Sequence, residues 1–204
     1  MNLYILMNLF LKKCTILQSK GNTNVDKRTQ RCFFNKYKRD ADDSEIKVGQ
    51  LLTEQKGGTW KKSKLRDDIK KHIDLIWIDN DNNKHTIDVK LPKKTRRTDK
   101  EPDNERTWIE LLNVSGKPGW IDGEEEYVAF VRSGQYNDVL FVNREKLSKF
   151  VKEKTKFSIV NDFNSGKSYD LYTRKKWGNN DLCTIVPFDD IKPFVEFTIE
   201  NYES

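Results

Sequence analysis

Two short apolar runs near the middle of the chain predict a β-hairpin. The first occupies residues 72–79 and the second residues 85–91, and residues 80–83, with the sequence Asn-Asp-Asn-Asn, separate them. Both runs contain several β-branched residues, which favour strands, and Asn and Asp are common in the turns between paired strands. The pattern therefore predicts two consecutive strands joined by a short polar turn.

An acidic residue interrupts the first of these runs. Side chains alternate between the two faces of a strand, so Ile73, Leu75 and Trp77 share one face, and Asp74 lies on the other face with two isoleucines. Because both faces are apolar, we expect both to be buried. An ionised carboxylate in such a place is costly unless a cation or hydrogen bonds compensate it.

In the second run, an acid and a base lie side by side. Asp88 and Lys90 are two residues apart, so they project from the same face of the predicted strand, opposite Ile87 and Val89. Whether Asp74 shares that face depends on the register of the hairpin. Pairing Asp74 with Asp88 or with Lys90 brings all three side chains to one face, whereas a shift of one residue turns Asp74 away.

An Asp in a buried strand followed by Asp-x-Lys in the next strand resembles the PD-(D/E)XK nuclease superfamily. The resemblance implies that Asp74 and Asp88 bind Mg²⁺, or Mn²⁺ in its place, and that Lys90 assists the attack of water on a phosphodiester. A Pro usually precedes the first acid, and Ile73 occupies that position here. The alternative is a solvated hairpin whose Asp88 and Lys90 face water and have no catalytic role.

A helix before the hairpin carries another candidate acid. Asp43 or Ser44 can cap a helix that runs to about Gln55, with Glu45 in its first turn. In nucleases of this superfamily the first core helix commonly carries a Glu that reaches the metal, and the resemblance assigns that role to Glu45. The alternative is a first-turn acid that the helix dipole stabilises.

A strand predicted after the hairpin, over residues 107–114, carries a third acid, Glu110. Residues 108–120 resemble a W-x-E-x-x-N-x-x-G-x-x-G-W stretch of phage and viral members of the same nuclease group. A carboxylate in an apolar strand needs a compensating positive charge. For Glu110 that charge is either the cation of the site, which would make Glu110 a further site residue, or a structural partner such as Arg106. Trp120, at the end of the stretch, can pack in the core or stack on a base.

The remaining pattern alternates further strands with one helix. The chain is predicted to form strands over residues 127–131, 139–142 and 182–186, a strand within 169–174, a helix capped by Asn143, and a closing segment over 191–202. Together with the resemblance, this alternation implies an α/β domain of restriction-endonuclease-like fold. Its mixed central β-sheet would be flanked by helices and would carry Asp74, Asp88 and Lys90.

Length and charge divide the chain unevenly. Its 204 residues are enough for one domain, expected over residues 41–204, with residues 1–40 as a basic, flexible N-terminal arm. Residues 1–39 contain nine Lys and Arg but only one acid, Asp26. Such an arm fits a targeting peptide, a nucleic-acid-binding extension or translated sequence upstream of the real start, and the sequence leaves these open.

The net charge of +6 favours a polyanionic partner. Two basic clusters flank the predicted hairpin, and this position favours phosphate contact over a merely solvated surface. The expected nucleic-acid-binding residues are Lys61, Lys62, Lys64, Lys93, Lys94, Arg96 and Arg97.

Other classes of function find little support. Three scattered cysteines and two histidines argue against a disulfide framework, a zinc site and a histidine-based triad, and they favour a reducing, cytoplasmic location inside a cell. The apolar segment over residues 3–11 is too short to span a membrane, so no membrane partner is expected. Glycine-rich phosphate-binding motifs are absent from the sequence.

The resulting hypothesis is a metal-dependent nuclease that hydrolyses phosphodiester bonds, with DNA as the expected substrate; a homodimer is left open. A non-catalytic nucleic-acid-binding protein on the same fold is the main alternative, and a structural or interaction protein is another. Retention of Asp74, Asp88 and Lys90 together favours the nuclease, because a binding protein gains nothing from buried acids that face an anionic ligand.

Overall fold

The computed structural model describes residues 27–64, 71–95, 99–156, 159–160, 166–173 and 179–203, and only the backbone at residues 27–39 and 159–160. The helices and strands are, in chain order, α2 (Lys27–Lys56), β1 (Thr59–Lys62), β2 (Leu75–Ile78), β3 (Lys84–Lys90), β4 (Arg106–Leu112), the 3-10 turn η1 (Trp120–Asp122), β5 (Tyr127–Arg132), β6 (Asp138–Asn143), α4 (Arg144–Lys154), β7 (Ile159–Val160), β8 (Leu171–Tyr172), β9 (Leu182–Pro187), α5 (Phe188–Ile191), the 3-10 turn η3 (Lys192–Phe194) and β10 (Val195–Glu200).

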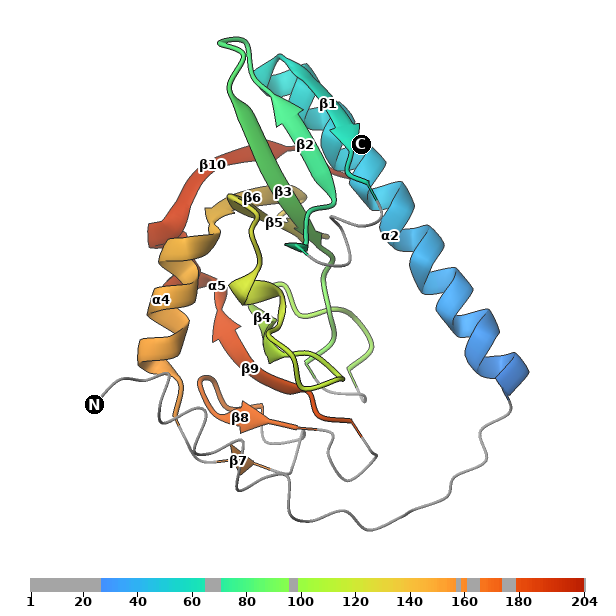
Figure 1. Ribbon diagram of the computed structural model, residues 1–204, viewed down its shortest axis with the longest axis vertical. Helices are drawn as coiled ribbons and strands as arrows, with labels where there is room; N and C mark the ends of the chain where they lie inside the picture. Colours follow the sequence, from blue (N-terminus) through green and yellow to red (C-terminus); the bar gives the residue numbers. More distant parts are fainter. Residues whose placement is uncertain are drawn as a thin grey trace.

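The fold is mixed α/β, with two sheets (Figure 1). The larger sheet has six strands in the order β1-β2-β3-β5-β6-β10, and only β3 and β5 run parallel within it. The smaller sheet has the order β4-β9-β8-β7. After β3 the chain therefore leaves the larger sheet, contributes β4 to the smaller one and returns as β5.

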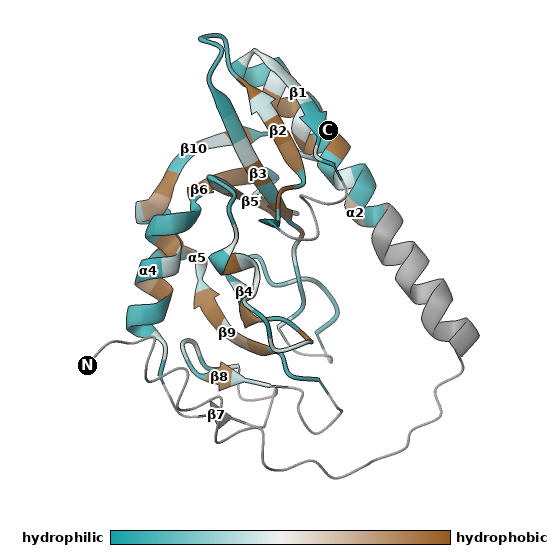
Figure 2. Cartoon of the chain, in the orientation of Figure 1, coloured by the Kyte–Doolittle hydropathy of each residue, from teal (hydrophilic) through white to brown (hydrophobic). Residues whose placement is uncertain are grey.

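Apolar side chains cover both faces of the six-stranded sheet. On one face, Val48 and Leu52 of α2 pack with Leu75 and Ile87 of the predicted hairpin. On the other face, strands β5 and β6 pack with α4, η1 and β9. The hydropathy colouring shows apolar residues on β2 and β9, whereas the turn between β2 and β3 is hydrophilic (Figure 2). One face of the hairpin is buried as predicted, through Leu75, Trp77 and Ile87, whereas Ile76 and Ile78 on the other face of β2 are only half-buried.

Helix α2 begins earlier than the sequence pattern indicated. It starts at Lys27 instead of Asp43 or Ser44, so it runs through the expected arm boundary near residue 40. The hydroxyl of Ser44 donates a hydrogen bond of 2.7 Å to the carbonyl oxygen of Asp40, four residues earlier, and so acts inside the helix and not as its cap. Residues 27–56 contain no Pro and a single Gly, at position 49, so nothing interrupts the helix.

Strand β1 was not predicted, because Lys61 and Lys62 belong to a basic cluster without the apolar alternation of a strand. Its four residues pair with β2, and Trp60 lies opposite Trp77. Trp60 also packs against α2 at Gly49, where an added Cβ would lie 2.3 Å from the indole. A small residue in α2 and one aromatic residue in β1 thus hold this edge strand against the helix.

The later elements agree with the predictions. Asn143 caps α4 by accepting a hydrogen bond of 3.0 Å from the backbone N–H of Lys146. Strands β5 and β6 form the predicted hairpin, and β9 includes the predicted segment over residues 182–186. The closing segment over residues 191–202 follows α5 and contains η3 and β10, which pairs with β6.

Candidate active site

The register of the β2–β3 hairpin decides whether the two acids meet. Leu75 lies opposite Ile87 and Ile78 opposite Lys84, so the same register places Asp74 opposite Asp88. This is one of the two registers that bring both acids to one face, and the prediction is confirmed. The backbone N–H of Asp74 donates a hydrogen bond of 2.9 Å to the carbonyl oxygen of Ile87, which continues the ladder beyond the end of β2.

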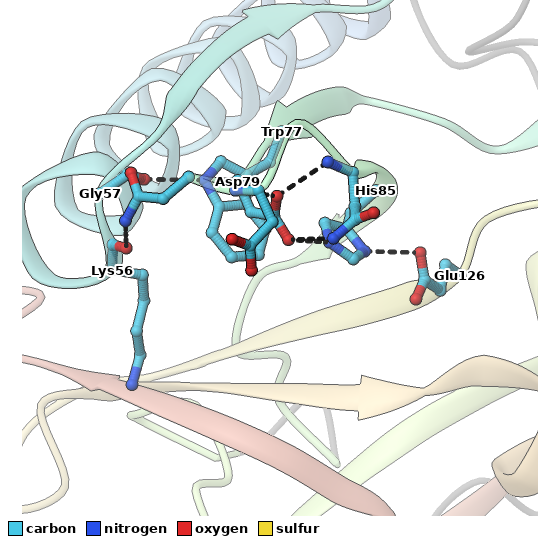
Figure 3. A network of polar contacts seen from close by, with 9 residues as sticks. Lys56, Gly57, Trp77, Asp79, His85 and Glu126 are labelled. Atoms are coloured by element: carbon cyan, nitrogen blue, oxygen red, sulfur yellow. Dashed lines mark hydrogen bonds and ion pairs between the residues drawn. The ribbon is translucent and has the colours of Figure 1, made fainter.

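The turn of this hairpin is attached to the end of α2 (Figure 3). The indole N–H of Trp77 donates a hydrogen bond of 3.0 Å to the carbonyl oxygen of Gly57, and the side-chain amide of Asn80 donates one of 3.2 Å to that of Lys56. Both acceptors lie at the C-terminal end of the helix, where carbonyl groups lack partners within the helix. These two hydrogen bonds give the carbonyl groups partners and hold the hairpin against the end of α2.

A second set of contacts ties the hairpin to the segment before β5 (Figure 3). The imidazole of His85 lies between two carboxylates, with Nε2 at 3.2 Å from Oδ2 of Asp79 and Nδ1 at 2.9 Å from Oε2 of Glu126. Its ring also stacks on Trp77, with 4.9 Å between the ring centroids. Burial acts to lower the pKa of His85, but Glu126 and Asp79 outweigh it and raise the pKa above the usual 6.5.

This arrangement predicts a pH-dependent contribution of His85 to stability. A raised folded-state pKa stabilises the fold fully below the unfolded pKa of about 6.5, and that contribution is lost as the pH rises through the folded pKa. Asp79 stays ionised throughout, because the hydrogen bond from the Asn83 side chain and further hydrogen bonds lower its pKa to about 2.

The measurement compares wild type with His85→Gln in denaturant unfolding between about pH 5.5 and about pH 8.5. The loss of unfolding free energy in the variant should be largest at the acidic end of this range and should shrink toward the alkaline end. A loss that stays constant across the range would show that His85 is not charged in the folded protein.

Asp74 and Asp88 form a buried pair of acids. Asp88 is 2% exposed, and its pKa is raised by burial. Burial, and then the charge of Asp88, raise the pKa of Asp74 to about 7. Oδ2 of Asp74 accepts a hydrogen bond of 2.7 Å from the backbone N–H of Val89. Asp74 therefore titrates near neutral pH.

Lys90 lies beside this pair on the same face of the sheet. Its Nζ is 2.6 Å from Oδ1 of Asp88 and 5.1 Å from the ring centroid of Trp120. Burial acts to lower the pKa of Lys90, but the charges of Asp88 and Asp74 outweigh it, so the amine is a charged ammonium group. Trp120 is 4% exposed and packs on Phe130 in the core, which is the first of its two predicted roles.

Glu45 reaches toward the acid pair from α2. Burial, and then the charge of Asp74, raise the pKa of Glu45, so it lies within electrostatic reach of that carboxylate. Its Oε2 is 3.0 Å from Nζ of Lys62, which also lies 2.8 Å from Oδ1 of Asp42. Lys62, expected to contact nucleic acid, is thus held by two acids of the helix.

Glu110 lies in a different layer from the other candidate acids. It is part of β4 in the smaller sheet, opposite Cys183. Arg106, the structural partner considered for it, instead forms an ion pair of 2.8 Å with Asp103. Its charge acts on Lys93, as the charge of Asp88 does, and Glu110 remains a candidate from the sequence.

One acid of the site, Glu125, was missed in the sequence. Its side chain is fully buried, and neither of its oxygens has a hydrogen-bond partner. Burial, and then the charge of Asp88, raise its pKa to about 9. Glu125 is the middle residue of a Glu-Glu-Glu run, which by composition alone indicates a solvated loop. The parallel pairing of β5 with β3 brings this run near Asp88, and a local sequence pattern does not predict such a pairing.

The basic residues expected to contact nucleic acid lie around the hairpin. Lys61 of β1 and Lys64 are exposed, and so are Lys93 and Lys94, which follow β3. The loop after β3 is anchored, because the indole N–H of Trp108 donates a hydrogen bond of 3.1 Å to the carbonyl oxygen of Lys94. Arg96 and Arg97 lie outside the described residues.

The described residues do not form a ready-made metal site: none of their His, Cys, Asp and Glu side chains gather in a group of three or more that could bind an ion. The Lys90 ammonium group occupies Oδ1 of Asp88, and the backbone N–H of Val89 occupies Oδ2 of Asp74. Three buried oxygens in the same region have no partner, namely Oδ2 of Asp88 and both carboxylate oxygens of Glu125. Oxygens of this kind are the ligands that Mg²⁺ and Mn²⁺ prefer.

Comparisons with protein families, with curated proteins and with solved structures found no match to this chain. Among the described residues, no helix has the length and apolar character needed to cross a membrane.

Proposed function

We propose that this protein is a metal-dependent nuclease that hydrolyses phosphodiester bonds of DNA, with an active site of the PD-(D/E)XK type. The observation that supports the proposal is the hairpin register, with Asp74 opposite Asp88 and Lys90 beside them on one face of the sheet. A one-residue shift would have separated the acids.

The topology supports a restriction-endonuclease-like fold. The expected fold has a mixed central sheet that carries the three residues and helices that cover its faces. Here β1, β2 and β3 are antiparallel, β5 is parallel to β3, and α2 packs on one face of the sheet. Trp120, from the stretch that resembles phage and viral members of the group, lies against Lys90.

The proposed mechanism uses the charges of the site. Asp74 and Asp88 would hold a Mg²⁺ or Mn²⁺ ion, which supplies charge to the scissile phosphate and lowers the pKa of a bound water. Binding the ion requires Asp74 to give up the proton that its pKa of about 7 retains near neutral pH. Lys90, as an ammonium group, positions the attacking water and offsets the negative charge that develops on the phosphate.

The burial of the acids separates this proposal from a purely binding role. Asp88 and Glu125 are buried with unpartnered oxygens, and burying such groups costs free energy. A protein that only binds the phosphate backbone has no use for negative charge there. A bound cation would compensate the free-energy cost of burying these carboxylates, because their negative charge would bind it.

The test is to incubate the full chain with linear, circular, single-stranded and branched DNA, and with RNA, in Mg²⁺, Mn²⁺ or a chelator. We expect cleavage products with either metal and none with the chelator. DNA binding at low salt without cleavage in either metal would favour the binding protein. If neither binding nor cleavage occurs, the protein does not act on nucleic acid.

A further inference from the structure

Glu125 is a buried acid that the mechanism above does not use. It lies immediately before β5, and its carboxylate folds back against Gly123, where an added Cβ would lie 2.0 Å from its Oε2. Position 123 therefore has to be a glycine for Glu125 to occupy this place. Neither oxygen of this carboxylate has a hydrogen-bond partner.

The electrostatic effects show which charged groups lie near the carboxylate. The largest charge effect on Glu125 comes from Asp88, and smaller effects come from Arg144 and Lys90. The charge of Glu125 in turn acts on Lys90. The buried, unpartnered carboxylate of Glu125 is therefore near Asp88 and Lys90.

A structural role does not account for this side chain. A buried carboxylate that stabilises a fold normally accepts hydrogen bonds or pairs with a cation. The neighbouring Glu124, in contrast, is exposed and pairs with Lys71 at 2.7 Å. The carboxylate of Glu125 and Oδ2 of Asp88 are unpartnered oxygens in one buried region, and a cation would compensate the cost of burying them.

We propose that Glu125 binds the divalent cation together with Asp88, so that the ion is held between β3 and the entry to β5. This inference rests on the proposed function for the presence of a cation, and it adds a ligand that the Asp-x-Lys pattern does not contain. Mg²⁺ in proteins usually takes one or two carboxylates and keeps several waters. Asp88 and Glu125 can supply these two carboxylates, and Asp74 lies opposite Asp88 in the hairpin.

The experiment measures cation binding without nucleic acid, by the loss of the free Mn²⁺ electron paramagnetic resonance signal and by calorimetry with Mg²⁺. The variant is Glu125→Gln, and the matched control is Glu124→Gln. Gln reproduces the size and shape of Glu, and no hydrogen bond to the Glu125 carboxylate is lost, so the metal-free variant should keep the wild-type melting temperature.

We expect Glu125→Gln to weaken Mn²⁺ binding by at least about tenfold and to reduce the rise in melting temperature on adding Mg²⁺. Glu124→Gln should match wild type in both measurements. Equal Mn²⁺ affinity in wild type and Glu125→Gln would overturn this inference and leave the proposed nuclease standing. If wild type itself binds neither cation, both the inference and the proposed function are wrong.

Discussion

Asp88→Asn should lower the rate of DNA cleavage by at least about 10²–10³-fold, the range found when one preorganised charge-stabilising group is removed from an active site. The substitution removes the carboxylate charge that acts on Asp74 and pairs with Lys90. Asn has the same shape, so the variant should still fold, but its melting temperature should fall because the ion pair with Lys90 is lost. Single-turnover cleavage with saturating metal is the measurement.

Lys90→Met is the companion variant. It keeps the apolar stem and removes the ammonium group, so cleavage should fall similarly. The matched control is Asp81→Asn, because Asp81 is exposed in the turn of the same hairpin. Asp81→Asn should cleave like wild type. Wild-type rates for folded Asp88→Asn or Lys90→Met would rule out the proposed mechanism.

Gly58→Ala should lower the free energy of unfolding by about 3 kcal/mol or more. Gly58 has φ of +78°, which L-residues rarely adopt, and a Cβ there would lie 2.1 Å from the carbonyl oxygen of Ile78. That oxygen belongs to β2, so the hairpin would have to move away from the end of α2. Denaturant unfolding measures the loss.

Gly134→Ala separates the two causes. Gly134 also has a left-handed φ, of +64°, but nothing lies within 4 Å of an added Cβ. We expect this variant to lose only about 1 kcal/mol, from backbone strain alone. Equal losses in the two variants would show that close packing at Gly58 contributes nothing.

The parts that the sequence predicts well are those governed by local periodicity. Period-two alternation identified the β2–β3 hairpin and limited its register to two choices that bring Asp74 to Asp88, and the structure adopts one of them. The cap of α4 at Asn143 follows from a single residue type, and it is present. These features depend on neighbours within a few residues.

The parts that the sequence did not reveal depend on distant contacts. Strand β1 is mostly polar, and it is a strand because β2 and α2 lie beside it. Glu125 lies in an acidic run whose burial depends on β5 pairing in parallel with β3. Pairing of that kind requires a crossover, and its partner cannot be identified from either segment alone.

The crossover between β3 and β5 also affects the order in which the chain folds. Asp74, Asp88 and Lys90 lie within one hairpin, but an isolated two-stranded hairpin is only marginally stable in water. The strand that buries Asp88 arrives after the whole of residues 91–126, which first contribute β4 to another sheet. Contacts between such distant segments form late in folding. During synthesis on the ribosome, a chain that has emerged only as far as Lys90 would therefore already carry these three residues, but Asp88 would lack the strand that buries it.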